Sequence, residues 1–75
     1  MDINRLIHMA NQIADFFKAY PQEEAVAGVA GHLRQFWNPH MRGQILNHLE
    51  AGGEGLHPLT AAALKSLGHN ETNTP

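Results

Sequence analysis

The side chains of this sequence that could take part in chemistry are six histidines, seven carboxylates and a few hydroxyls. A zinc site on a helix uses two histidines at i and i+4 together with a third ligand. No two histidines here have that spacing, since they occupy positions 8, 32, 40, 48, 57 and 69. His40 and His48 lie two helical turns apart, about 12 Å, which is too far to share one ion. We therefore predict no metal site and interpret the histidines as solvent-facing or capping residues.

Catalysis by a carboxylate or a hydroxyl has no better support. Glu23 and Glu24 are adjacent, but they lie at a predicted helix start, where they complement the helix dipole. Glu50 and Glu54 flank glycines, and Ser66 has no basic neighbour in the sequence. The stretch "AGGEG" follows a predicted helix and lacks the lysine of a phosphate-binding loop. We therefore predict no catalytic or cofactor-binding residue and no enzymatic activity for the chain by itself.

The composition excludes several further classes of function. The 75 residues include no cysteine, so disulfides, thiolate-held iron–sulfur clusters and a thiol nucleophile are excluded. The formal net charge is −2, and the five basic residues are scattered. Nucleic-acid binding uses a contiguous basic stripe that displaces counterions from phosphates, so we expect no nucleic-acid partner. The first predicted helix carries too many polar residues for a signal peptide or a membrane span, which favours a cytoplasmic protein without membrane contact.

A small DNA-binding regulator is a remote alternative. The second and third predicted helices join through a tight turn, as in a helix-turn-helix motif. The recognition helix would then be "PHMRGQILNHL", with Arg42, Gln44 and Asn47 available to read bases. Lysines that would contact the phosphates are missing, and the domain is slightly acidic. This alternative therefore ranks well behind a protein–protein function.

The apolar pattern predicts an all-α fold, a small bundle of three to four short helices. The helical periodicity and the Pro and Gly residues divide the chain into segments at about residues 2–19, 21–37, 39–51 and 58–67. Asn38 and Pro39 suit the start of the third helix, while Gly52 and Gly53 suit its end. Residues 1–68 are expected to form a single helical domain that ends at Gly68, and residues 69–75 a flexible, disordered polar tail.

Two predicted helices carry more than a core stripe. Met9, Phe16 and Tyr20 form a second apolar ridge beside the core stripe of the first helix. That helix should therefore lie centrally among the others or face a partner. Gly28 and Gly31 lie away from the core stripe of the second helix, although glycine inside a helix is less stable than alanine by about 1 kcal/mol. They suggest that another backbone approaches there; the alternative is that the helix merely tolerates them.

Candidate partner-binding residues cluster where the second helix meets the third. Trp, Tyr and Arg are enriched at the centres of protein interfaces. Trp37 precedes the Asn38–Pro39 break, with Arg34 one turn before it and Arg42 five residues after it. Because Phe36 points about 100° away from Trp37 around the helix, we place Trp37 in the core and Phe36 on the surface. We predict that Arg34, Phe36 and Arg42 bind a partner, with Met9, Phe16 and Tyr20 as a second candidate surface. If the first two helices pack antiparallel, Phe36 lies near this second surface. Alternatively, both rings close the end of the bundle.

Three stretches of the sequence resemble a known family. They are "MANQIADFF", "PQEEAVAGVAGHLRQFWNPHMRGQIL" and "HPLTAAAL", and together they are similar to the delta subunit of soluble NAD-dependent formate dehydrogenases. The resemblance covers roughly residues 3–67, and the block from His32 to Arg42 is its most specific part together with the opening "MANQI". The family often has an acidic residue before the proline of this block and a basic one after it. Asn38 and His40 stand in those places here.

The resemblance implies a non-catalytic accessory subunit that carries no cofactor and stabilises or helps assemble a multi-subunit enzyme. Other subunits of the holoenzyme would hold a molybdenum or tungsten bis-pterin guanine dinucleotide centre, iron–sulfur clusters and FMN. They would oxidise formate to carbon dioxide and pass the electrons to NAD. The expected partners are these formate dehydrogenase subunits, the alpha subunit foremost. The alternative within the same family is a transient assembly chaperone for the cofactor-bearing subunit.

Overall fold

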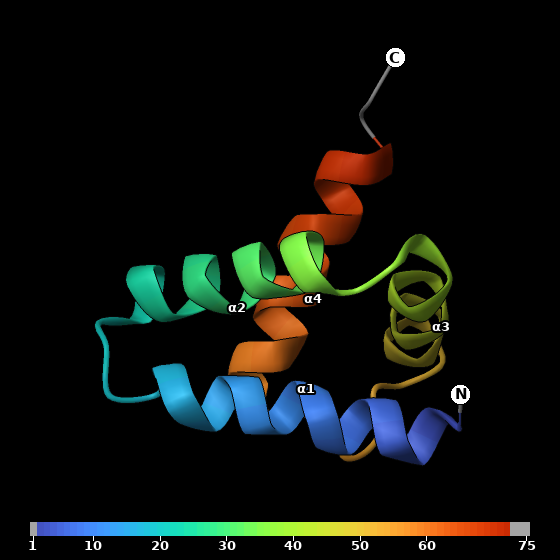
Figure 1. Cartoon of the computed structure of the whole chain (residues 1–75), viewed down its shortest axis with the longest axis horizontal. Helices are drawn as coiled ribbons and strands as arrows, with labels where there is room; N and C mark the ends of the chain where they lie inside the picture. The colour runs from blue at the N-terminus through green and yellow to red at the C-terminus, as the bar shows by residue number, and fades with distance from the viewer. Residues whose placement is uncertain (1, 73–75) are drawn as a thin grey trace.

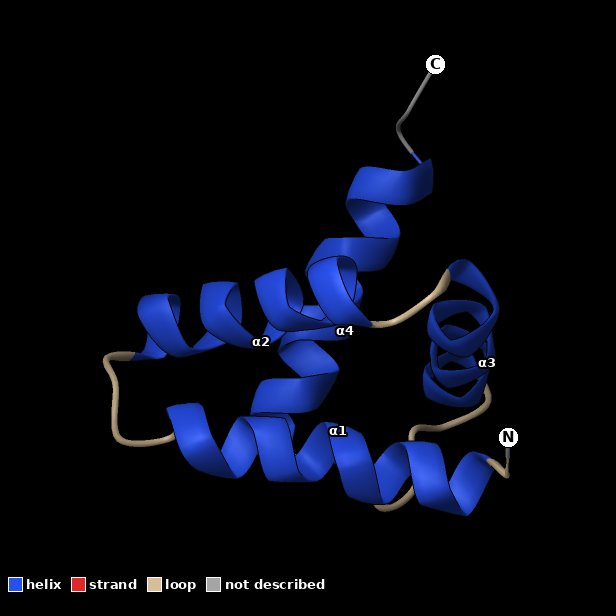
Figure 2. Cartoon of the chain, in the orientation of Figure 1, coloured by secondary structure: helices blue, strands red, loops and turns tan. Residues whose placement is uncertain are grey.

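Four α-helices make up the computed structural model, which describes residues 2–72. They are α1 (Ile3–Phe17), α2 (Gln22–Phe36), α3 (Pro39–Glu50) and α4 (Pro58–Thr72). Figure 2 shows helices and connecting loops, and no strand, over this part of the chain. The predicted all-α fold is therefore confirmed, and the number of helices is four.

Side-chain caps fix where α1 and α3 begin. Oδ1 of Asp2 accepts a hydrogen bond from the backbone N of Asn4 at 3.3 Å. Oδ1 of Asn38 accepts one from the backbone N of Met41 at 2.8 Å, and Pro39 occupies the first turn of α3. Each carboxylate or amide oxygen thereby satisfies an N–H group that has no partner within its helix. The predicted corner between α2 and α3 is confirmed.

Glycines end α3 as predicted, but they do not end α4. Gly53 has a φ of 67°, and its backbone N donates to O of His48 at 2.9 Å, which closes the last turn of α3. The helix end predicted at Gly68 is wrong, because α4 continues to Thr72. A Cβ atom at Gly68 would lie 3.2 Å from Cδ2 of Leu46, so this glycine allows α3 to pack closely on α4. The single domain over residues 1–68 and the flexible tail over residues 69–75 stay predictions, and residues 73–75 lie outside the described part of the chain.

The helices form a hairpin that is crossed by α4. Figure 1 shows α1 and α2 running antiparallel, α4 passing behind both, and α3 beside one end of the hairpin. α4 packs against all three other helices and most extensively against α2. The core that they enclose consists of small and aliphatic side chains and one indole, namely Leu6, Ala10, Ala14, Ala25, Val29, Ala30, Leu33, Trp37, Ile45, Leu59, Ala63, Leu64 and Leu67.

The first helix lies centrally among the others, which is one of the two positions that its wide apolar surface suggested. It packs against α2, α3 and α4, with Leu6, Ala10 and Ala14 completely buried at intervals of one turn. The two alanines leave room for α4, whose buried Thr60 donates a hydrogen bond to O of Ala10 at 3.4 Å. The other flank of α1, which includes the exposed Phe16, is not covered by the other residues that the structure describes.

Candidate functional site

An apolar groove lies between α1 and α2. Its walls are Gln12, Ile13, Phe16 and Phe17 from α1 and His32 from α2, and its volume is about 430 Å³. The groove exists because α1 and α2 run antiparallel with Ile13, Phe17 and His32 facing their common seam. Two of the five lining side chains are polar, so the groove offers few hydrogen-bonding groups to an occupant.

Three large aromatic side chains stand open to solvent around this groove. Phe16 is 69% exposed, Tyr20 49% and Phe36 65%. The ring centroids of Phe36 and His32 lie 4.7 Å apart, and those of Tyr20 and Phe17 lie 5.6 Å apart. Since His32, Phe16 and Phe17 all line the groove, the three exposed rings belong to one surface. We call this surface the aromatic face; it consists of Phe16, Phe17, Tyr20, His32 and Phe36.

The predicted partner-binding residues do not all lie on the aromatic face. Phe36 was predicted to be exposed and to lie near Phe16 and Tyr20 if the first two helices pack antiparallel, and the structure, in which they do, brings the three rings to one surface. Met9, the third member of the ridge, is half-buried and packs against the core. Trp37 is buried in the core as predicted, but Phe36 is exposed, so the alternative in which both rings close the end of the bundle is wrong.

The two arginines beside the corner have different surroundings. Arg34 is exposed. Arg42 was expected to be displayed in the same way, and that expectation is wrong: its guanidinium Nη1 donates to O of Trp37 and, at 3.3 Å, to O of Arg34. These carbonyl groups end α2 and have no partner within the helix. Arg42 is half-buried and ties α3 to the end of α2, so its positive charge offsets the negative end of that helix.

The glycines of α2 also differ from each other. A Cβ atom at Gly28 would lie closer than 3.0 Å to three atoms of the Phe17 ring. The close approach expected there is therefore made by a side chain of α1, and not by another backbone. A Cβ atom at Gly31 would meet nothing within 4 Å. Gly28 thus builds the groove by seating Phe17, whereas no packing within the described chain requires Gly31 to be glycine.

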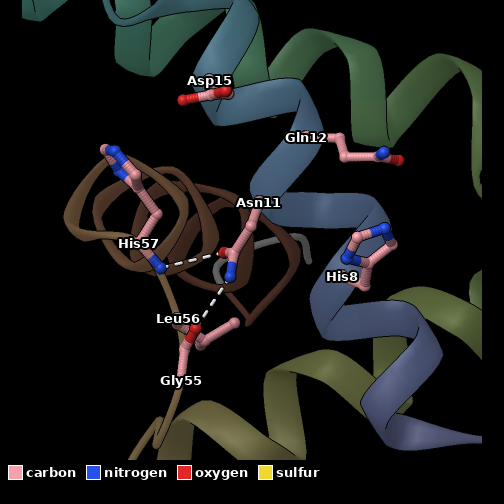
Figure 3. A pocket seen from close by; sticks show the side chains of 7 residues that line it. All are labelled: His8, Asn11, Gln12, Asp15, Gly55, Leu56 and His57. Atoms are coloured by element: carbon pink, nitrogen blue, oxygen red, sulfur yellow. Dashed lines mark hydrogen bonds between the residues drawn. The ribbon is translucent and has the colours of Figure 1, made fainter.

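A second, polar depression of about 470 Å³ lies where α1 meets the loop before α4 (Figure 3). The side chain of Asn11 donates to O of Gly55 at 2.7 Å and accepts from the backbone N of His57 at 2.9 Å. Nδ1 of His57 accepts from the backbone N of Leu59 at 3.0 Å and so caps α4. A hydrogen bond from Lys18, 2.8 Å away, lowers the pKa of the Asp15 carboxyl at the rim.

These contacts hold the loop before α4 in place against α1. Both functions of the Asn11 amide are engaged, and the His57 ring is engaged as a cap. Among the side chains that the structure describes, which are those of residues 2–68, no group of three or more His, Cys, Asp or Glu could hold a metal ion. The depression therefore has a structural role in fixing the loop against α1. In the same part of the chain, no helix combines the length and the apolar character needed to cross a lipid bilayer.

Sequence reasoning missed two residues that matter to these sites. His32 was interpreted, with the other histidines, as a solvent-facing or capping residue, although it stands one turn before Phe36 and one turn after Gly28. That spacing is the available signal that it shares their face of α2. Asn11 gave no signal, because its partners Gly55 and His57 are 44 and 46 residues away.

Comparison with known proteins gives one match. The family model described as NADH-dependent formate dehydrogenase delta subunit FdsD matches residues 5–64, which is most of the chain. No curated protein and no solved structure matches the chain. The matched segment begins in α1 and ends in α4, so it includes the whole aromatic face and the corner.

Proposed function

Because the chain belongs to the family of NADH-dependent formate dehydrogenase delta subunits, we propose that it is a non-catalytic accessory subunit that stabilises or helps assemble this enzyme. In this role the other subunits oxidise formate to carbon dioxide and reduce NAD. The chain provides a binding surface and takes no part in the reaction itself. Its partners are the other formate dehydrogenase subunits, and we propose the cofactor-bearing alpha subunit as the one that it contacts.

The observation that carries this proposal is the aromatic face. Phe16, Tyr20 and Phe36 remain largely exposed although the domain has a complete core of its own. Removing a phenylalanine side chain from water contributes about 1.5–3 kcal/mol when burial is complete. An exposed ion pair, by comparison, contributes about 0–1 kcal/mol. We therefore propose that the aromatic rings supply most of the affinity for the partner and that Arg34 contributes less.

The donor groups of the chain support the proposal that the cofactors are held elsewhere. Iron–sulfur clusters need cysteine thiolates, and the sequence contains no cysteine. The described residues offer no cluster of metal-binding side chains, and the groove offers an apolar lining without the charged groups that a pterin or flavin phosphate needs. The molybdenum or tungsten centre, the iron–sulfur clusters and the FMN would accordingly belong to the other subunits.

Co-purification from cells that produce all subunits tests the proposal. A permanent subunit stays with the enzyme at constant stoichiometry through gel filtration, and omitting it lowers the yield of assembled enzyme. Formate oxidation by the chain alone, or a tightly bound metal or flavin at one per chain, would contradict the non-catalytic role. If the chain raises the yield but is absent from the purified enzyme, it acts as a transient assembly chaperone instead.

A further inference from the structure

We infer that the groove of the aromatic face receives one amphipathic α-helix of another subunit, oriented by a charge at each end of the groove. This inference rests on the proposed function, because it takes for granted that the chain is bound to the enzyme. It adds the secondary structure of the bound segment and the order of the charged residues along that segment.

The lining of the groove favours a helix over an extended segment. An extended segment presents backbone N–H and C=O groups that need hydrogen-bond partners, either on a sheet edge or on polar side chains. The described part of this chain has no strand, and the groove is lined by Ile13, Phe16 and Phe17 with only two polar side chains. A helix satisfies its own backbone groups and can place an apolar stripe between α1 and α2.

Exposed residues of opposite charge lie toward the two ends of the α1–α2 hairpin that holds the groove. Arg5 lies one turn before Met9 on α1, and Glu24 lies one turn before Gly28 on α2; both are exposed. Because the two helices run antiparallel, these residues lie toward opposite ends of the hairpin (Figure 1). The ion pair between Lys18 and Asp15 is separate from them, and neither Arg5 nor Glu24 forms an ion pair within residues 2–72. A complementary helix carries a basic residue at the Glu24 end and an acidic residue at the Arg5 end.

Site-specific photo-cross-linking in the assembled enzyme tests the inference. A benzophenone amino acid replaces Glu24 in one variant, Phe36 in a second and the exposed Ser66 of α4 in a control. Positions 24 and 36 are separated by twelve residues on one helix, or about 18 Å. A bound helix therefore gives cross-links about twelve residues apart in one other subunit, whereas an extended segment gives them about five apart.

The expected result is a pair of cross-links with helical spacing, with a lysine or arginine near the one from position 24 and an aspartate or glutamate near the one from position 36. Cross-links with extended spacing, cross-links to a second copy of this chain, or cross-links from position 66 alone would overturn the inference. Retention of each variant in the enzyme is measured on the same samples. If the unmodified chain does not stay with the enzyme, the proposed function is contradicted. If it stays but is bound through another face, only this inference is contradicted.

Discussion

At the scale of single residues, Phe36 and Trp37 show how neighbours can have opposite roles. They are adjacent in sequence and similar in chemistry, but Trp37 is 5% exposed and Phe36 is 65% exposed. The difference arises because α2 ends at Phe36, and Trp37 leaves the helix with an extended φ and ψ of −94° and 138°. Arg34 and Arg42 form a second pair with the same charge and different surroundings. Both pairs give substitutions that separate folding from binding.

Substitution Trp37→Ala should unfold the free chain. Truncating a buried tryptophan typically destabilises a protein by about 3–5 kcal/mol, which equals the whole stability expected of a domain this small. Phe36→Ala is the matched control and should leave the helical circular dichroism signal and the melting temperature nearly unchanged. Thermal melts of the two variants provide the measurement. Equal melting temperatures would contradict the assignment of Trp37 to the core.

Substitution Arg42→Ala should destabilise the free chain by about 1 kcal/mol, because the carbonyl groups at the end of α2 lose a charged donor. Arg34→Ala should change the stability much less, since that side chain is exposed. Urea unfolding followed by circular dichroism compares the two. If Arg34→Ala proves the more destabilising of the two, then Arg42 does not cap α2 in solution.

At the scale of elements, the pairing of α1 with α2 depends on a glycine that accommodates a ring. Phe17 of α1 lies directly over Gly28 of α2, and this contact sets how far apart the two helices lie. The loop between α3 and α4 is held in a comparable way at the other side of α1, by the two hydrogen bonds of Asn11. Each contact joins elements that are distant in sequence, so each can be tested by one substitution.

Gly28→Ala and Gly31→Ala should have opposite effects on stability. The added methyl group at position 28 meets the Phe17 ring, and such overpacking destabilises by about 1–3 kcal/mol. At position 31 the methyl group meets nothing, and alanine stabilises a helix interior by up to about 1 kcal/mol. Midpoints of urea unfolding measure both effects. In a Phe17→Leu background the penalty at position 28 should become smaller; an unchanged penalty would show that the ring is not its cause.

Asn11→Ala should loosen the loop at residues 52–57 without unfolding the helices. The substitution leaves O of Gly55 and the backbone N of His57 without their partner, which destabilises by about 1–3 kcal/mol. Hydrogen exchange of the loop amides should become faster than in the wild type. Asn47→Ala, at an exposed position of α3, serves as the control. Unchanged exchange in the Asn11 variant would mean that the loop is held by other contacts.

At the scale of the whole molecule, a small core and a large exposed aromatic surface occur together. The core is built mainly from leucine and alanine, while two of the three phenylalanines and the tyrosine are exposed. A domain of this size has only about 3–5 kcal/mol of stability without a further source of free energy. A partner that binds only the folded state raises the free energy of unfolding by RT ln(1 + [L]/Kd), where [L] is the concentration of free partner and Kd its dissociation constant.

The double substitution Phe16→Ser and Phe36→Ser should therefore separate the stability of the free chain from its assembly. Both rings are largely exposed, so the free chain should melt at nearly the wild-type temperature. The same variant should be lost from the enzyme during gel filtration, because the partner no longer covers two phenylalanine rings. Serine substitutions at Ala27 and Ala51, which are also exposed, provide a control with the same number of substitutions. Retention at the wild-type level would place the docking surface elsewhere.

The sequence alone predicted the class of the fold and most of its local structure. Helical periodicity, the cap at Asn38 and the glycines after α3 act over a few residues, so they can be read without knowing the tertiary structure. The contrast between buried Trp37 and exposed Phe36 was also predicted, from their angles around one helix, although in the structure Trp37 has left α2 with an extended backbone. The family also followed from the sequence, because the motif from His32 to Arg42 is continuous along the chain.

Only the tertiary structure decided which of these residues meet. The sequence placed Phe36 near Phe16 and Tyr20 only on the condition that α1 and α2 pack antiparallel, and only the tertiary structure meets that condition. It could not show that Gly68 lies inside a helix against Leu46, since a glycine that ends a helix and one that admits a neighbour look alike in sequence. The cap that Arg42 forms depends on the angle at the corner. Each of these contacts joins different elements, and their geometry is fixed only when the helices pack around the core.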